Sequence, residues 1–204
     1  YCPRCGTALS SHEVSQGYKE VKERSAVVRF KVVGQDNTYI YAWTTTPWTL
    51  PSNLALCVNP HETYCHVRAE GRVYIMAQAL VKTVLEGTEP EILDEMPGTA
   101  LHGLEYEPLY RFVEPDKKAW FVICDDYVTM TDGTGIVHIA PAFGEDDNRV
   151  SRENGLPFVN LVDAQGKMVA ETAWPGVFVK DADPLILEDL KQRGLLFAAA
   201  PSPP

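Results

Sequence analysis

The chain has 204 residues, 45% of them hydrophobic and 23% charged, which is the composition of a globular domain with room for a sizeable core. Its formal net charge of −10 argues against free-standing nucleic-acid binding, because affinity for phosphates comes from neutralising Lys and Arg. No apolar run approaches membrane-spanning length, no secretory signal is recognisable, and five cysteines at scattered spacings do not suggest a disulfide framework. We therefore expect a reducing, cytoplasmic setting and no membrane partner.

The first 25 residues predict a polar lead-in segment to the folded part of the chain. Cys2 and Cys5 have C-x-x-C spacing, at which two thiolates can share one tetrahedral Zn²⁺. No second C-x-x-C follows, so we interpret the pair as half of a zinc knuckle whose other ligands belong to a longer parent chain. An unmetallated, exposed turn is the alternative.

Alternating apolar and polar residues predict a succession of strands in the first half of the chain. Residues 26–33 and 38–43 form one expected hairpin, and residues 64–69 and 72–77 form a second. Residues 54–58 are a further apolar run of a kind typical of a strand. The first half is therefore expected to be mainly β-structure.

The second half mixes strands with helices. The expected elements are a short helix at 78–85, loops and short strands at 88–118, a buried strand at 120–124, a short strand at 136–140, a helix from Glu145 to about Asn154, a small strand at 158–162, and an amphipathic helix from Asp183 to Gly194. Strands outnumber helices, so we predict an α+β fold with a β-barrel-like core of hairpin-linked strands and a few peripheral helices. The main domain is expected to span residues 26–197, followed by a linker-like tail at 198–204.

Residues 43–53, W-T-T-T-P-W-T-L-P-S-N, link two of the expected strands. The two prolines exclude a regular central strand here, because proline lacks an N–H and fixes φ. Thr44, Thr45 and Thr46 could be the frayed end of the preceding strand, or could cap a short helix that starts at Pro47. They could equally form a rigid lip of hydroxyl and backbone groups that orients a polar substrate.

A second stretch, residues 128–148, favours the last interpretation. It holds a tight T-D-G-T-G loop in which Gly133 and Gly135 allow positive φ. A strand with His138 at its centre follows, and then a helix whose first turn carries Asp147. Such an arrangement commonly builds a pocket wall, where a carboxylate can hold a substrate ammonium and a histidine can limit the depth of the pocket or hold a water.

The threonine stretch and the sequence G-T-G-I-V-H-I-A-P-A-F-G-E-D-D at 133–147 together resemble the editing domain inserted in isoleucyl-tRNA synthetases. The opening C-P-R-C-G-T-A-L-S-S-H-E-V-S-Q-G-Y is similar to the start of that insertion, so the resemblance covers nearly the whole chain. Related valyl and leucyl enzymes usually read T-T-R-P at the threonine stretch, whereas Thr46 stands in the arginine's place here, which favours the isoleucyl branch. The H-I-G-H and K-M-S-K-S signatures of the synthetic site are absent, so amino-acid activation is not expected.

The resemblance implies post-transfer editing, which is the hydrolysis of valine mischarged onto tRNA(Ile) with isoleucine excluded by size. It leaves open whether valyl-adenylate is also hydrolysed before transfer. The expected partners are the acceptor end of the valine-charged tRNA and the remainder of a parent synthetase. No cofactor is expected for the hydrolysis, and Zn²⁺ at Cys2 and Cys5 would need ligands from the longer parent chain.

Four catalytic positions follow from the resemblance. Thr46 would lie nearest the aminoacyl group, and Asn53 would hold substrate or water. His138 would line the side-chain pocket and help to exclude isoleucine, and Asp147 would bind the α-ammonium through a charge-assisted contact. Substrate binding is further expected of Thr44, Thr45, Trp48, Gly133 and Gly135.

We expect water to attack the ester directly, because no basic residue lies next to the threonine stretch in sequence to activate a protein nucleophile. Folding could still bring one there. The main alternative function is a module that binds the acceptor end without hydrolysing it, and the four intact catalytic positions argue against that. A zinc-ribbon interaction domain is a second alternative, supported by a single C-x-x-C.

Overall fold

A computed structural model describes residues 24–201, and the Cys2–Cys5 pair with most of the expected lead-in segment lies outside them. In chain order the described strands are β1 (Arg24–Lys31), β2 (Thr38–Thr44), β3 (Ala55–Val58), β4 (Thr63–Ala69), β5 (Arg72–Ala77), β6 (Glu91–Pro97), β7 (Phe121–Cys124), β8 (Ile136–Ile139) and β9 (Leu196–Pro201). The described helices are the 3₁₀ helices η1 (Pro47–Ser52), η2 (Gln78–Leu80) and η3 (Gly98–Leu101) and the α-helices α2 (Val81–Val84), α3 (Glu145–Glu153) and α4 (Val179–Gln192).

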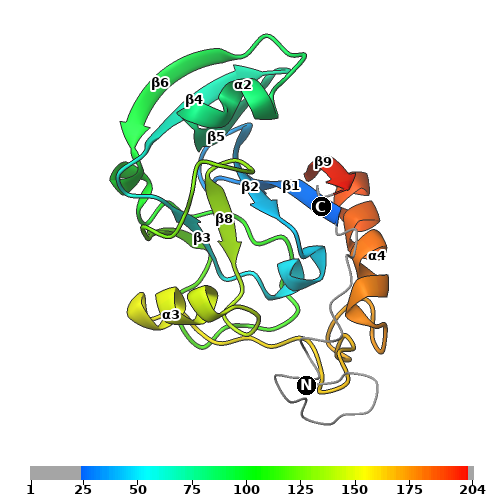
Figure 1. Ribbon diagram of the computed structural model, residues 1–204. Helices are drawn as coiled ribbons and strands as arrows, with labels where there is room; N and C mark the ends of the chain where they lie inside the picture. The colour runs from blue at the N-terminus through cyan, green and yellow to red at the C-terminus, as the bar shows by residue number, and fades with distance from the viewer. Residues whose placement is uncertain (1–23, 202–204) are drawn as a thin grey trace, which may run out of the picture.

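The described strands form one mixed sheet that curls into a half-barrel, with few helices around it (Figure 1). The main path runs β6-β4-β5-β2-β8-β3-β7, and β1 pairs with both β2 and β9. The predicted α+β class, the barrel-like core and both predicted hairpins, β1–β2 and β4–β5, are confirmed. Strand β2 also pairs in parallel with β5 and β8, and β3 pairs in parallel with β7. Parallel neighbours are joined by long connections, so the alternation of residues along the chain does not show which strands pair.

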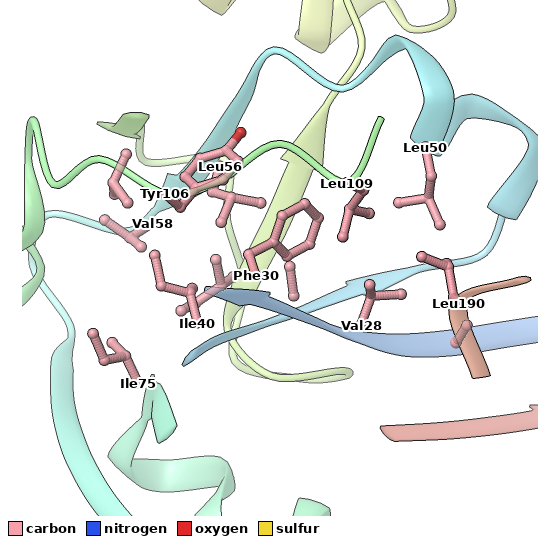
Figure 2. Packing of buried hydrophobic residues seen from close by; sticks show 14 of the residues in the cluster. Val28, Phe30, Ile40, Leu50, Leu56, Val58, Ile75, Tyr106, Leu109 and Leu190 are labelled. Atoms are coloured by element: carbon pink, nitrogen blue, oxygen red, sulfur yellow. The ribbon is translucent and has the colours of Figure 1, made fainter. Parts of the chain in front are cut away.

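The main hydrophobic core joins the sheet to the helices that flank the threonine stretch. Figure 2 shows Phe30 of β1, Leu56 of β3, Leu50 of η1 and Leu190 of α4 in one cluster, and each is at most 1% exposed. The rings of Phe30 and Tyr106 meet edge to face with centroids 5.2 Å apart. Such a close-packed interior fixes η1 against the sheet, so the threonine stretch has a rigid base.

Helix α4 begins earlier than the sequence predicts. It starts at Val179 instead of Asp183, and Pro184 lies inside it. We interpreted Asp183-Pro184 as a start signal because proline suits the first turn of a helix. In the structure the buried carboxylate of Asp183 instead accepts the backbone N–H of Trp48 at 2.8 Å, which ties α4 to η1.

Three other expectations differ from the structure. Residues 198–201 of the expected tail belong to β9, which pairs antiparallel with β1. The expected strand at 158–162 is irregular chain with one isolated bridge between Val162 and Met168. Strand β6 is seven residues long within a segment expected to hold only short strands, and because it is an edge strand with nearly every residue exposed it carries no apolar alternation.

None of the helices between residues 24 and 201 combines the length and the apolar character needed to cross a membrane.

Candidate active site

The threonine stretch leaves the sheet at Thr44, the last residue of β2, and turns into η1 at Pro47. Pro47 occupies the start of the helix, where a missing N–H breaks no helical hydrogen bond, and Thr46 is the N-cap residue. The Thr46 hydroxyl makes no capping bond, so a helix does start where one interpretation placed it but the side chain is not used as its cap. The hydroxyls of the stretch are therefore available for other contacts.

Thr44, Thr46 and Thr49 share a small hydrogen-bond network. Thr44 Oγ1 accepts the backbone N–H of Thr46 at 3.1 Å. Thr49 Oγ1 donates to the Thr46 carbonyl at 2.8 Å and lies 3.3 Å from Thr46 Oγ1. Because the one hydroxyl hydrogen of Thr49 is donated to the Thr46 carbonyl, the Thr46 hydroxyl is the donor in the 3.3 Å contact between the two side chains. Among the described residues, the hydroxyl hydrogens of Thr44 and Thr45 have no acceptor.

Among the described residues, His138 hydrogen-bonds to Thr49 and to no other threonine. Its Nε2 lies 2.9 Å from Thr49 Oγ1. Since the Thr49 hydrogen is already spent, Nε2 must carry the proton, a tautomer assigned from the hydrogen bonds. Nδ1 is then a bare lone pair, buried and without a partner in the part of the chain that the structure describes. Burial lowers the pKa of His138 to about 4, so the ring is neutral at physiological pH.

Asp147 presents one open carboxylate oxygen. Its Oδ2 accepts the backbone N–H of Ala140 at 2.9 Å, while Oδ1 accepts no hydrogen bond from residues 24–201. Burial raises the pKa of this carboxyl, and the Ala140 N–H partly opposes the rise. A Cβ at Gly144 would lie only 3.3 Å from Oδ1, so the glycine leaves the space beside this oxygen clear. A half-buried carboxylate with one free oxygen is suited to binding a cation.

These residues surround a cavity of about 240 Å³, to which η1, β8 and α3 each contribute lining residues. Its lining consists of Trp43, Thr44, Thr45, Thr46, Thr49, Tyr127, Val137, His138, Phe143, Gly144 and Asp147. A second cavity of about 190 Å³ shares Trp43, Tyr127 and Val137 with it and extends to the T-D-G-T-G loop. A larger hollow of about 820 Å³ on α3 is lined only by polar side chains of that one helix, and we do not regard it as a site.

Of the nine predicted site residues, the structure brings five into the first cavity: Thr44, Thr45, Thr46, His138 and Asp147. Asn53 does not reach it. The Asn53 side chain donates to the Ala55 carbonyl at 2.9 Å and accepts the Tyr106 hydroxyl at 2.7 Å, and it is only 5% exposed. The structure thus places Asn53 at the exit of η1 with its side chain bonded to protein groups, and its expected role in holding substrate or water stays a prediction.

Trp48 and the two loop glycines support the walls. The Trp48 ring packs edge to face on Phe143, with centroids 4.9 Å apart. Gly133 and Gly135 both have φ of +71°. A Cβ on Gly133 would lie 2.7 Å from the Trp43 side chain, and a Cβ on Gly135 would lie 2.4 Å from β5. Only glycine allows this loop to lie so close to Trp43. Of the two cavities, Gly135 lines only the second.

Thr49, Tyr127 and Phe143 also line the cavity and were not predicted from the sequence. Thr49 stands three residues after Thr46, a spacing that brings side chains onto one face of a 3₁₀ helix, so a signal was present. Tyr127 and Phe143 lie in irregular turns after β7 and β8, where no periodic pattern marks which way a side chain faces.

Solved structures of synthetase editing domains share this fold. The structure titled GlLeuRS-CP1 matches with a TM-score of 0.72 and 15% identity, over 88% of this chain and 100% of that chain. The editing domain of P. knowlesi cytosolic leucyl-tRNA synthetase matches with a TM-score of 0.67 and 14% identity, over 92% of this chain and 99% of that one. The fold is therefore that of the CP1 editing domains of class I aminoacyl-tRNA synthetases.

Sequence comparison narrows this class, although no family model matches the chain. The isoleucine–tRNA ligase of Clostridium acetobutylicum is 59% identical over 198 residues, and that of Thermus thermophilus is 46% identical over 203 residues. Each match covers 97% of this chain and 19% of the relative, so the chain spans about one fifth of their length. Over 97% of its length the chain is thus similar to one segment of isoleucine–tRNA ligases, in agreement with the branch that Thr46 favoured, and its fold is that of CP1 editing domains.

Proposed function

We propose that this domain hydrolyses valine from mischarged Val-tRNA(Ile) and excludes isoleucine. The observation that carries the proposal is the cavity of about 240 Å³ in which threonine hydroxyls and the open oxygen of Asp147 face the same space. The editing-domain fold and the similarity to isoleucine–tRNA ligases support it. The acceptor end of the charged tRNA and the remainder of a parent synthetase are the partners, and the cytoplasm is the proposed location.

The need for such a site is physical. A hydrophobic synthetic pocket that accepts isoleucine rejects valine by only about 1–3 kcal/mol, a general limit for which the isoleucyl enzyme is itself the standard example. A second pocket that admits valine and is too small for isoleucine removes the error after it is made.

The substrate is placed by its charge and by its connection to the tRNA. The α-ammonium of the valyl ester binds Asp147 Oδ1, which is free to accept. The neutral ring of His138 limits the depth available to the side chain. The adjoining cavity of about 190 Å³ takes the terminal nucleoside, because the ester joins it directly to the aminoacyl group.

Water is the nucleophile in this mechanism. It adds to the ester carbonyl, the bond to the ribose oxygen breaks, and valine and uncharged tRNA are released. The unspent hydroxyl hydrogens of Thr44 and Thr45 can stabilise the carbonyl oxygen as negative charge develops on it. His138 does not activate Thr49 as a nucleophile, because Nε2 carries the proton in their contact. Valyl-adenylate presents the same ammonium and carbonyl, and its hydrolysis would use the same groups.

The test is deacylation of Val-tRNA(Ile) beside Ile-tRNA(Ile) by this chain at high concentration, with Asp147→Ala as the control. Selective loss of valine that depends on Asp147 would establish both the hydrolysis and the size exclusion. Binding of a non-hydrolysable valyl-adenosine analogue without hydrolysis would favour the acceptor-end binding module instead. If the chain neither hydrolyses Val-tRNA(Ile) nor binds the analogue, the proposal is refuted.

A further inference from the structure

Outside the cavity, one carboxylate connects two of its walls. Asp125 follows β7, and its side chain is 16% exposed. Its Oδ1 accepts a hydrogen bond from the backbone N–H of Tyr127 at 3.0 Å. The guanidinium of Arg149 donates from one nitrogen to Oδ2 at 2.9 Å and from the other to Oδ1 at 3.0 Å. Tyr127 lines the cavity, and Arg149 stands two residues after Asp147 on α3. Asp125 therefore joins a wall residue to the helix that carries the ammonium-binding carboxylate.

This ion pair differs from an ordinary surface pair. Exposed pairs contribute little, because solvent screens them and both side chains must be ordered. Here the Arg149 side chain is 42% exposed, but its guanidinium binds in the two-pronged geometry that matches a carboxylate, and the Asp125 side chain is only 16% exposed. Glu153 lies 3.2 Å and Asp146 3.5 Å from Arg149 on the same helix, which helps to aim it. The Arg149 guanidinium also holds the pKa of the Asp125 carboxyl below its usual range.

The two ends of the connection differ in how firmly they are held. Asp125 is fixed to the sheet, since its backbone N–H donates to the Val58 carbonyl of β3 at 3.0 Å. Helix α3 has nine residues, no side-chain cap at its N-terminus, and only Val150 and Ser151 buried. A short helix with so small a buried face depends on its polar contacts for its angle to the sheet.

We propose that Asp125 and Arg149 are positioning residues that set the distance between Tyr127 and Asp147 and thereby the size limit of the cavity. The inference rests on the proposed editing function and deepens it, because it assigns part of the discrimination between valine and isoleucine to residues outside the cavity. Loosening the pair lets α3 move outward, which both misplaces the ammonium and makes room for an additional methylene.

The test compares Arg149→Gln with Arg152→Gln. Arg152 is exposed on the same helix and forms no ion pair within residues 24–201, so its variant removes the same charge without the connection. We expect Arg149→Gln to raise KM for Val-tRNA(Ile) roughly tenfold and to reduce the preference for valine over isoleucine roughly tenfold, as neighbouring coupled residues typically do. Arg149→Lys, which supplies a single charge without the fork, should fall between the two. Arg152→Gln should match the unmodified chain.

A purely structural role predicts a different pattern, in which hydrolysis of both esters falls together as the folded fraction falls. The inference is overturned if the unmodified chain is selective and a folded Arg149→Gln variant keeps both its KM and its selectivity. A selective loss in Asp125→Asn, which retains an oxygen for the Tyr127 N–H, would support it independently. If the unmodified chain neither hydrolyses nor binds the valyl-adenosine analogue, the proposed function fails, and this inference fails with it.

Discussion

At the scale of single residues, the cavity combines two groups whose burial acts in opposite directions. Burial disfavours the charged form of each, so it raises the pKa of Asp147 and lowers the pKa of His138. In the proposed function, the neutral ring of His138 forms the wall that limits the size of the side chain. Asp147 has to be ionised to hold the substrate ammonium, so the proposal requires the fold to keep a partly desolvated charge.

Replacing Asp147 by Asn should therefore separate activity from stability. The folded pKa lies above the unfolded one, so ionisation at neutral pH destabilises the fold, and the loss is recovered as the pH falls through the folded pKa. Asp147→Asn should raise the free energy of unfolding at pH 7 and lower deacylation roughly 100-fold, as expected for a charge-assisted contact. Urea denaturation and single-turnover deacylation measure the two effects. A variant that is active, or less stable, would contradict the argument.

The contribution of His138 to the free energy of unfolding should depend on pH in the opposite direction. Its pKa is about 4 in the folded state and about 6.5 in the unfolded state, so its contribution to stability is complete above pH 6.5 and is lost as the pH falls from there towards 4. The total loss should be roughly 3 kcal/mol, from the difference between these two pKa values. Urea denaturation at a series of pH values should show a smaller acid loss in His138→Gln than in the unmodified chain. Equal losses in both proteins would rule out this assignment.

At the scale of elements, the T-D-G-T-G loop decides where β8 begins and where Trp43 lies. Both Gly133 and Gly135 have positive φ, but their surroundings are filled by different parts of the protein, Trp43 in one case and β5 in the other. The loop therefore sets the distances between β2, β5 and β8. A change in its shape would move Trp43, which belongs to the wall that the two cavities share.

Gly133→Ala tests this role. It meets both an unfavourable φ and the Trp43 side chain at 2.7 Å, so it should lower the free energy of unfolding by about 2–4 kcal/mol. Gly34→Ala is the matched control, because Gly34 has φ of +74° and nothing within 4 Å, so only the backbone term of about 1–2 kcal/mol applies. Urea denaturation of both variants measures the difference. Equal losses would mean that Trp43 moves aside at no cost.

Elements with local causes were predictable from the sequence, and elements with distant partners were not. The β4–β5 hairpin follows from alternation around Glu70 and Gly71, whose φ values of 51° and 75° fit a tight turn. Strand β9 depends on β1, which lies at the other end of the described chain, and its run of alanines has no alternation of its own. The start of α4 was misplaced because the role of Asp183 is set by Trp48, 135 residues away.

The same division applies to the site. The threonine stretch, His138 and Asp147 were predicted because residue type and the local strand–turn–helix pattern place them. The Thr49–His138 contact spans 89 residues, and no local pattern encodes it. The contact between Asn53 and Tyr106, which lies 53 residues further along the chain, was likewise not predictable from a local pattern.

At the scale of the whole molecule, Arg29 ties the last segment of the described chain to the sheet. Arg29 is 8% exposed, and one guanidinium nitrogen donates to the carbonyls of Gly194 at 3.1 Å and Leu196 at 3.2 Å. Its guanidinium also lies 5.4 Å from the centroid of the Phe197 ring. A single buried cation thus adds to the strand pairing of β1 with β9 and joins both strands to the turn that follows α4.

Arg29→Met should release that segment. The carbonyls of exposed Gly194 and half-buried Leu196 would lose a charged donor that is itself buried, so the free energy of unfolding should fall by about 1–3 kcal/mol. Hydrogen exchange at residues 194–201 should accelerate more than exchange in the β4–β5 hairpin. Lys31→Met is the control, because Lys31 is 42% exposed and pairs with Glu107 at the surface, and it should leave the unfolding midpoint unchanged. Uniform acceleration throughout the sheet would contradict a local role.

The register between β1 and β9 has a mechanical consequence. It starts by pairing Arg24 with Pro201 and ends by pairing Val28 with Leu196, so the two ends of the described chain lie side by side. A force that pulls residues 24 and 201 apart would load these pairs one after another, as in a zipper, because the hydrogen bonds of antiparallel strands run across the strands. Such a contact gives way at low force. Tension from a host enzyme would peel off β9 first, while β2, η1 and β8 would remain unloaded and the cavity would keep its shape.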